Sequence, residues 1–458
     1  MAGAPEPRRM ILNAFSMNCV SHIQQGMWTR KDTRQVEFGS LDPWIELAKV
    51  AEKGCFDTIF LADVIGLYDN YKGSANTSFR EAMQVPVNDP MLLIPAMASV
   101  TEHLGFAFTS SVLQAHPFTF ARQLSTLDHL TKGRVAWNVV TSYLPNAGTN
   151  LGFEGLPTHE ERYGRAEEYL EVVYKLLEGS WADDAVIDDR ERRVYVDPDR
   201  VRPINHHGSY YDVAGPHLSA PSIQRTPVLF QAGMSERGRD FAAQHAECVF
   251  VVGPSRSGSS IAADLHTRAQ AYGRAASDLK LIGGVAPIVG GTEAEAMAKR
   301  DEYENDLSIE AGLAHISGNI GADLGDIDPD HVREARPRHR QITTVFGGEH
   351  IVDVLIVPLA GAETDEIVES EIDGVGKDIG QLLILVRNQV DAGFQHVQRI
   401  GIDNRRGTVP VIAHPHHRTQ IRVRGGAIAR VGHVGTLRGI AASRAVELDV
   451  RISVVASA

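Results

Sequence analysis

Short apolar runs alternate with longer amphipathic stretches over roughly the first 310 residues, and this alternation limits the folds open to the chain. Seven apolar runs are each followed by a stretch with helical periodicity. They cover residues 9–15, 57–63, 104–111, 134–142, 226–233, 247–253 and 279–291. Strands that are apolar throughout and joined by helices indicate a parallel sheet covered by helices.

Two parallel-sheet folds compete for this pattern, a doubly wound sheet and a closed barrel. No GxGxxG motif follows the first run, which disfavours a dinucleotide-binding doubly wound sheet. We therefore predict an α/β fold, a (β/α)8 barrel of the TIM type with insertions. The barrel needs an eighth strand from beyond residue 310, so its last unit is not assigned.

The last quarter of the chain differs in composition from the rest. Residues 334–458 contain fourteen Arg, a single Lys at Lys377, and no Trp, Tyr, Met or Cys. We expect a barrel domain at 8–333 and an atypical segment at 334–458. Two interpretations of the segment stay open: an Arg-rich accessory segment, or a stretch that is not the native ending, for example after a shifted reading frame.

Composition excludes several classes of protein. The formal net charge of −13 argues against a nucleic-acid partner. Cys19, Cys55 and Cys248 are too few and too scattered for a disulfide framework or a CxxC metal site, which favours a reduced cytoplasmic setting. No apolar run reaches about 18 residues, and the N-terminus lacks a secretory pattern, so neither a membrane span nor a signal peptide is expected.

Polar residues stand where the predicted strands end, the place where barrels carry their active sites. They are Asn18, His22, Asp63, Thr109, Ser110, Ser111, Asn138, Thr141, Ser142, Gln231 and Ser235. This set is rich in neutral hydrogen-bonding groups and poor in carboxylates, which suits a polar heteroaromatic ring. No second His or Glu stands at metal-binding spacing from His22, so no metal site is predicted.

Each candidate also has a plainer interpretation. Asp63 is either a general base or a cap of the loop after its strand, and His22 is either a catalytic group or a polar lining residue. Ser235 precedes a helix start, where free N–H groups favour a phosphate, but it is equally suited to capping that helix. His159 and Tyr163 lie on the same face if residues 159–163 form a helix. They are then either two residues of the functional site or a pair on the protein surface at the start of that helix.

Several long motifs recur together and in order. They include FDTIFLAD, VNDPMLLIPAMASVTEHLGF, FARQLSTLDHLTKGRVAWNVVTS, HEERYGRAEEYLEVVYKLLEGSW, HHGSYYDVAGPH and PVLFQAGMSERGRDFAA. Over roughly residues 8–330 the chain thereby resembles the nitrilotriacetate monooxygenase/dibenzothiophene sulfone monooxygenase group of the bacterial-luciferase-like flavin monooxygenases. That resemblance implies a (β/α) barrel with insertions.

The resemblance also implies a chemistry. Reduced FMN from a separate NAD(P)H:flavin reductase and O2 would form a flavin C4a-(hydro)peroxide, which passes one oxygen atom to a small organic substrate. A homo-oligomer, dimer or tetramer, is expected. The rivals are a deazaflavin-dependent oxidoreductase of the same superfamily and a catalytically impaired flavin-binding protein.

By motif, the resemblance assigns Asp63 and Thr109 to the flavin pocket, with Asn138 and Ser142 lining it. It places His159, Tyr163 and Ser235 near the FMN ribityl chain and phosphate, and His22 on the substrate or peroxide side as the catalytic candidate. The family ending is not found. The nearest match to it is DAGFQHVQRIGID at 391–403.

Overall fold

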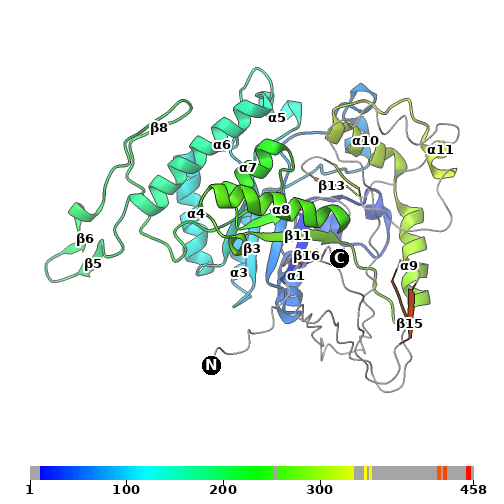
Figure 1. Ribbon diagram of the computed structural model, residues 1–458, viewed down its shortest axis with the longest axis horizontal. Helices are drawn as coiled ribbons and strands as arrows, with labels where there is room; N and C mark the ends of the chain where they lie inside the picture. Colours follow the sequence, from blue (N-terminus) through cyan, green and yellow to red (C-terminus); the bar gives the residue numbers. More distant parts are fainter. Residues whose placement is uncertain are drawn as a thin grey trace. The chain divides into compact units, whose positions relative to one another are not determined.

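The computed structural model describes residues 11–251 and 255–334, together with short strands at 345–347, 350–352, 420–423, 427–430 and 450–454. The chain divides into two units, Met1–Ile11 with Asn388–Leu448, and Leu12–Arg387 with Asp449–Ala458. In the first unit, β14 (Gln420–Val423) and β15 (Ala427–Arg430) form an antiparallel hairpin. The second unit contains the parallel sheet (Figure 1).

Seven parallel strands lie side by side in the second unit, one in each predicted apolar run. They are β1 (Leu12–Met17), β2 (Thr58–Ala62), β3 (Gly105–Ser111), β4 (Val135–Val140), β9 (Val228–Gln231), β10 (Cys248–Phe250) and β11 (Lys280–Val285). Each pairs in parallel with the next in that order. The prediction of a parallel α/β sheet is confirmed.

A further strand comes from the C-terminal segment. β16 (Val450–Val454) pairs in parallel with both β1 and β11. The sequence required a strand from beyond residue 310 but did not identify this one, because five residues inside an atypical segment carry little periodicity. The region 391–403, singled out from the sequence, lies outside the described residues.

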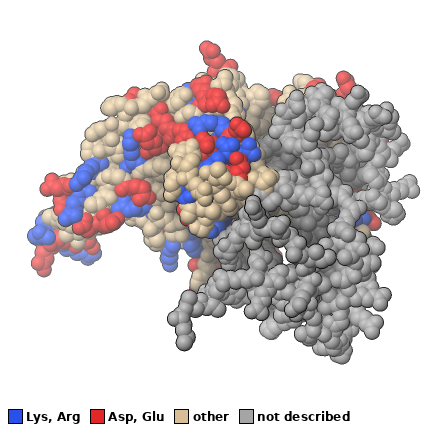
Figure 2. Space-filling model, in the orientation of Figure 1, with Lys and Arg blue, Asp and Glu red and all other residues tan. Residues whose placement is uncertain are grey.

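Helices cover the outside of the sheet, and α7 and α8 cross in front of the strands in Figure 1. Those that follow the strands of the sheet are α1 (Asp42–Lys53), α3 (Ile94–Ala98), α4 (Pro117–Thr131), α6 (His159–Tyr174), α7 (Glu236–His245), α8 (Ser255–Ala271) and α9 (Glu293–Asp306). The described part of the chain also contains α2 (Asn76–Arg80), α5 (Pro145–Asn150), α10 (Ile309–Ile320) and α11 (Pro329–Glu334). Lys and Arg side chains lie next to Asp and Glu on the visible face (Figure 2). Among the ion pairs of the described residues, Asp264 pairs with both Arg239 and Arg268.

Two apolar layers hold this arrangement. Between the sheet and the helices, Phe120 packs on Trp137 with ring centroids 4.5 Å apart, inside a large buried cluster. On the inner side of the curved sheet, the ring of Phe60 in β2 packs against the rings of Phe15 in β1 and Phe230 in β9. The distances between ring centroids are 5.4 Å and 5.3 Å, respectively. These rings fill the space between strands and leave polar groups to the strand ends.

Two hairpins are inserted between α6 and β9. They are β5 (Val186–Asp189) with β6 (Val194–Val196), and β7 (His206–His207) with β8 (Asp212–Val213). The Glu168 carboxylate of α6 accepts hydrogen bonds from the backbone N–H groups of Ser209, Tyr210 and Tyr211, which fixes the second hairpin. Among the described residues, no helix has the length and apolar character needed to cross a membrane.

Candidate active site

A pocket opens at the carboxyl ends of β2, β3 and β4. We call it the strand-end pocket. Its lining consists of Asp63, Val64, Ile65, Thr109, Ser111, Gln114, Val140, Ser142 and Tyr143. Three residues predicted from the sequence, Asp63, Thr109 and Ser142, therefore meet in one cavity. Asn138 stands directly behind it and donates a hydrogen bond from Nδ2 to Thr109 Oγ1 at 2.9 Å.

Hydrogen bonds among the lining residues hold the pocket wall in place. Ser142, which has a φ of 62°, donates to Ser111 Oγ at 2.8 Å. The side-chain oxygen of Gln114 accepts from Ser110 Oγ at 3.0 Å and from the backbone N–H of Ser111 at 2.7 Å. The wall is thus made of neutral donors and acceptors with fixed orientation, as the sequence suggested.

Asp63 is the one carboxyl group in the lining. Burial of its side chain, aided by the nearby charge of Asp89, raises its pKa from 3.8 to about 7. Hydrogen bonds from the backbone of Val64 and from Gln114 oppose this rise without cancelling it. Asp63 therefore changes protonation state near neutral pH, and it can offer a hydroxyl donor or a negative charge to a bound molecule.

A second group of predicted residues meets at the start of α7. We call His159, Tyr163 and Ser235 the helix-start cluster. His159 Nε2 lies 3.2 Å from Ser235 Oγ, and the rings of His159 and Tyr163 are 4.9 Å apart. Ser235 also caps α7, since its hydroxyl accepts from the N–H of Gly238 at 3.0 Å. The capping interpretation is confirmed, and it leaves the hydroxyl proton of Ser235 available to donate.

Two glycines let the backbone close around this cluster. A Cβ at Gly233 would lie 2.5 Å from both Tyr163 Oη and the side-chain nitrogen of Gln231. A Cβ at Gly238 would lie 2.7 Å from Tyr163 Oη and 2.9 Å from the Gly233 carbonyl carbon. The turn between β9 and α7 is therefore built to pack tightly on Tyr163, which is fully buried.

His22 does not appear among the residues that line the strand-end pocket. Its ring packs on Phe15 with centroids 4.8 Å apart. Its backbone carbonyl accepts hydrogen bonds from the side-chain amides of Gln84 at 2.8 Å and Gln25 at 3.0 Å. His22 thus enters this network through its backbone carbonyl.

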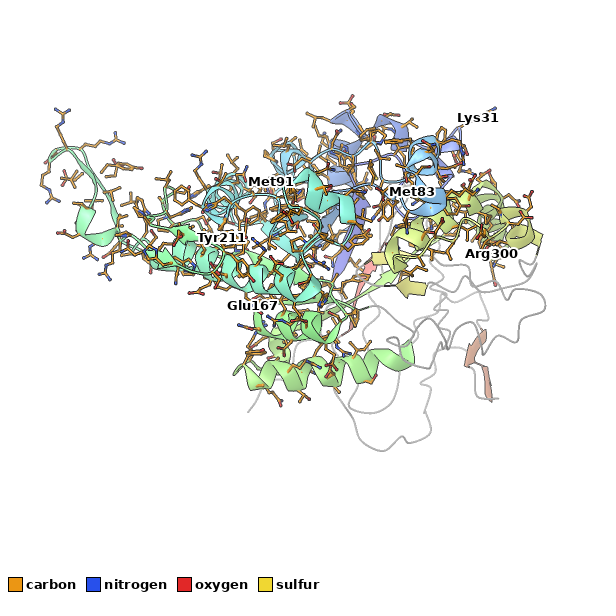
Figure 3. All side chains as sticks on the ribbon, turned by 90° about the horizontal axis from the view of Figure 1, so that it is seen from above. Lys31, Met83, Met91, Glu167, Tyr211 and Arg300 are labelled. Atoms are coloured by element: carbon orange, nitrogen blue, oxygen red, sulfur yellow. The ribbon has the colours of Figure 1, made fainter. Side chains whose placement is uncertain are left out.

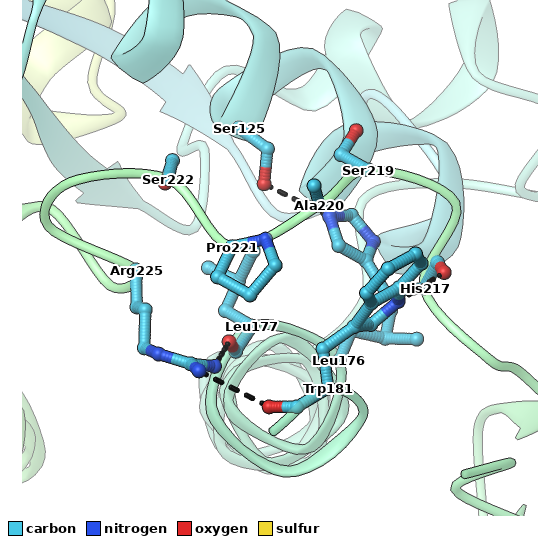
Figure 4. Close-up of a pocket in the computed structure, with 10 residues that line it drawn as sticks. All are labelled: Ser125, Leu176, Leu177, Trp181, His217, Ser219, Ala220, Pro221, Ser222 and Arg225. Atoms are coloured by element: carbon cyan, nitrogen blue, oxygen red, sulfur yellow. Dashed lines mark hydrogen bonds between the residues drawn. The ribbon is translucent and has the colours of Figure 1, made fainter. Parts of the chain in front are cut away.

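A second pocket lies near the amino end of β9 (Figure 4). There Ser125 Oγ and His217 Nε2 are 2.9 Å apart, while Arg225 donates to the backbone carbonyls of Leu177 and Trp181. Burial, together with His129, lowers the pKa of His217 to about 4, so this ring is neutral. Because it lies at the opposite end of the strands from the predicted site residues, we assign this pocket a packing role.

Some pocket residues were missed by sequence reasoning. Gln114 and Tyr143 both line the cavity, and the Tyr143 hydroxyl contacts that of buried Tyr68, which in turn bonds buried Gln84. Gln114 and Tyr143 each stand three residues after the ends of β3 and β4, so a wider window around each strand end would have included them. Tyr68 and Gln84 sit in a long loop, where the sequence offers no comparable signal.

Several known proteins are similar to this chain in sequence or in structure. A family model described as luciferase-like monooxygenase matches residues 15–354. The long-chain alkane monooxygenase of Geobacillus thermodenitrificans is 53% identical over 69% of this chain and 72% of its own length. The dibenzothiophene-sulfone monooxygenase of Rhodococcus erythropolis is 37% identical over 68% of each chain.

Two further relatives extend the comparison. Nitrilotriacetate monooxygenase component A of Aminobacter aminovorans is 35% identical over 68% of this chain and 70% of its own length. A crystal structure of riboflavin lyase with modified FMN and the substrate riboflavin superposes with a TM-score of 0.67 at 34% identity, covering 71% of this chain and 73% of that one. The resemblance seen in the sequence and the prediction of a monooxygenase enzyme are confirmed: this chain belongs to the luciferase-like monooxygenase family.

Proposed function

We propose that this enzyme uses reduced FMN and O2 to insert one oxygen atom into a small organic substrate. The observation that carries the proposal is that six of the seven residues expected from the sequence to contact a flavin lie in the strand-end pocket or in the helix-start cluster, while the seventh, Asn138, donates a hydrogen bond to Thr109. The monooxygenase names of three relatives and the modified FMN bound in the solved riboflavin lyase support the same assignment.

The residues present fit a flavin. The strand-end pocket offers neutral donors and acceptors from Thr109, Ser111 and Ser142, which match the polar edge of an isoalloxazine ring. The helix-start cluster offers the hydroxyl proton of Ser235, the imidazole of His159, and the N–H groups of the first turn of α7, which suit a phosphate. When bound, reduced FMN would supply the electrons that activate O2.

The chain's own residues would position the ring and limit solvent. Asn138 orients Thr109, and Ser142 orients Ser111, so two hydroxyls are held at fixed angles to a ligand. Asp63 would hold or release a proton at its carboxyl oxygen close to neutral pH. The phenylalanine rings between β1, β2 and β9 fill space inside the sheet, and we expect them to limit the approach of water to a bound flavin through the sheet.

We further propose the wider setting of the enzyme. Residues 8–333 carry the barrel domain, and β16 of the segment 334–458 supplies the eighth barrel strand. A separate NAD(P)H:flavin reductase delivers reduced FMN, the protein works as a homo-oligomer, and it acts in the cytoplasm. The name "component A" of one relative is consistent with a two-component system.

The central experiment combines the purified chain with FMN, NADH, a flavin reductase and 18O2, using hexadecane and dimethyl sulfide as probe substrates. We expect one labelled oxygen atom in the product and no product under nitrogen. Oxidation of a probe without O2 would favour the deazaflavin-type oxidoreductase. Flavin binding without any product from a panel of small organic substrates would favour an impaired flavin-binding protein.

Replacement of Ser235 by Ala tests the phosphate contact. We expect FMN binding to weaken by roughly 1.5–3 kcal/mol, because the lost hydrogen bond would be to a charged group. Ser308→Ala is the matched control, since Ser308 caps α10 in the same way, accepting from the N–H of Ala311 at 3.2 Å. FMN affinity that falls equally in both variants, or in neither, would reduce Ser235 to a helix cap.

A further inference from the structure

A chain of buried side-chain hydrogen bonds leads from the His22 loop to the strand-end pocket. Gln84 Nε2 donates to the His22 carbonyl at 2.8 Å, and Tyr68 Oη donates to Gln84 Oε1 at 3.1 Å. The hydroxyl of Tyr68 in turn contacts the hydroxyl of Tyr143, which lines the pocket. Gln84 directly follows Met83, whose place beside α10 can be followed in Figure 3.

The direction in which each proton is donated along this series of hydrogen bonds follows from its far end, the backbone carbonyl of His22. A backbone carbonyl only accepts, so the Gln84 side chain must turn its NH2 group toward His22 and its oxygen toward Tyr68. That amide oxygen also only accepts, so the single hydroxyl proton of Tyr68 is committed to Gln84. Tyr68 can then only accept from Tyr143, which must donate its own proton to Tyr68.

Burial keeps this polarity in place. Tyr68 and Gln84 are 2% and 6% exposed, so solvent does not offer competing partners. Burial also raises the pKa of Tyr68, which keeps its hydroxyl protonated over the working range of pH. The proton of the Tyr143 hydroxyl is therefore committed to Tyr68, so toward a molecule bound in the pocket that Tyr143 lines its oxygen can accept a hydrogen bond but not donate one.

We propose that Tyr143 is a specificity-determining residue that accepts a hydrogen bond from an N–H group of the bound flavin and so favours reduced over oxidised flavin. Fully reduced flavin carries an N–H at N5, where oxidised flavin has only a lone pair. A hydroxyl oxygen that can only accept a hydrogen bond attracts the N5–H group of reduced flavin and repels the N5 lone pair of oxidised flavin. This inference rests on the proposed function, which makes a flavin the occupant of the pocket.

The test measures the dissociation constants of oxidised FMN and of photoreduced FMN under anaerobic conditions, by fluorescence titration of the full chain. The ratio of the two constants is the readout, independent of turnover. In Tyr143→Phe we expect the preference for reduced FMN to fall about 3- to 10-fold, as for the loss of one neutral hydrogen bond. Tyr174→Phe is the control, since its hydroxyl bonds His245 outside this chain of residues.

Gln84→Leu tests the direction of the protons with the Tyr143 hydroxyl intact. Without Gln84, Tyr68 can donate to Tyr143, which can then turn its own proton into the pocket. We expect oxidised FMN to bind more tightly and the preference for reduced FMN to fall. The double variant Tyr143→Phe with Gln84→Leu should have the same ratio of dissociation constants as Tyr143→Phe alone, because no Tyr143 hydroxyl remains to be redirected. If the two substitutions were independent packing defects, their effects on the ratio would add.

Several results would overturn the inference. One is equal weakening of both redox forms in Tyr143→Phe, and another is additive effects in the double variant. A third is an unchanged ratio in Gln84→Leu, which also decides the matter if Tyr143→Phe does not fold. Wild-type chain that binds neither form of FMN would instead refute the proposed function, and this inference with it.

Discussion

Replacing Asp63 by Asn should make the stability of the protein less dependent on pH. The variant resembles the neutral acid in shape and cannot ionise. In the folded wild-type chain, burial raises the pKa of Asp63 to about 7, against 3.8 in the unfolded state. Since each pKa unit corresponds to about 1.4 kcal/mol, full ionisation of the buried carboxyl costs up to about 4 kcal/mol. Screening and local relaxation lower this to about 2–4 kcal/mol.

The sign follows from proton linkage. The folded state holds the Asp63 proton more tightly than the unfolded state, so the contribution to stability is complete below pH 3.8 and is lost as pH rises to about 7. The free energy of unfolding of wild type, minus that of Asp63→Asn, should therefore fall by about 2–4 kcal/mol between pH 4 and pH 8.

The assay is urea unfolding of both proteins without flavin, followed by tryptophan fluorescence at intervals of half a pH unit. Taking the difference between the two proteins removes the contributions of all other titrating groups. A second variant, Asp89→Asn, should reduce the pH dependence of wild type, because the charge of Asp89 contributes to the raised pKa of Asp63. A difference that stays constant from pH 4 to pH 8 would refute the account of Asp63 as a buried group that ionises near neutrality.

Three further substitutions test the packing around the site. Gly238→Ala should destabilise the fold by about 1–3 kcal/mol in urea unfolding, because its Cβ would clash with Tyr163 Oη and the Gly233 backbone. Gly312→Ala in α10, where a Cβ meets open space, should instead stabilise the fold by about 0.5–1 kcal/mol. Equal changes in unfolding free energy for Gly238→Ala and Gly312→Ala would contradict the close packing around Gly238. Glu168→Gln should cost roughly 1.5–3 kcal/mol, since three backbone N–H groups bond to the charged carboxylate. Burial opposes the charge of Glu168, but these hydrogen bonds hold its pKa below 4.5. The loss of unfolding free energy in Glu168→Gln should therefore disappear in strong acid, where the wild-type carboxyl is also neutral. A loss that persists in strong acid would show that the charge plays no part.

The sequence by itself determined the order of strands and helices and most of the residues at the strand ends. Strands buried on both faces need continuous apolar runs, and such runs are visible without a structure. Apolar periodicity continues over residues 90–102, but the structure does not form one long helix there. The structure has a short 3-10 turn at Pro90–Leu93, followed by α3 at Ile94–Ala98, with Pro95 near its start. Proline in the pattern limits a regular helix even where apolar periodicity continues.

Resemblance to a family, rather than periodicity, singled out His159, Tyr163 and Ser235 among many polar residues. The tertiary structure decided how they meet: β9 ends beside α6, and two glycines let the turn before α7 close on Tyr163. For His22, the structure places its backbone carbonyl in hydrogen bonds with Gln84 and Gln25 and its ring against Phe15, outside the lining of the strand-end pocket.

Three features could be found only in the tertiary structure. They are the strand β16, which pairs with both β1 and β11, the raised pKa of Asp63, and the direction in which the Tyr143 hydroxyl donates its proton. Each depends on groups far apart in the chain: β16 lies more than 400 residues after β1, and Tyr143 lies 75 residues after Tyr68. Local sequence records which side chains can donate, accept or be buried. Which of them share a low-dielectric space, and therefore which way a proton points, is set by long-range contacts alone.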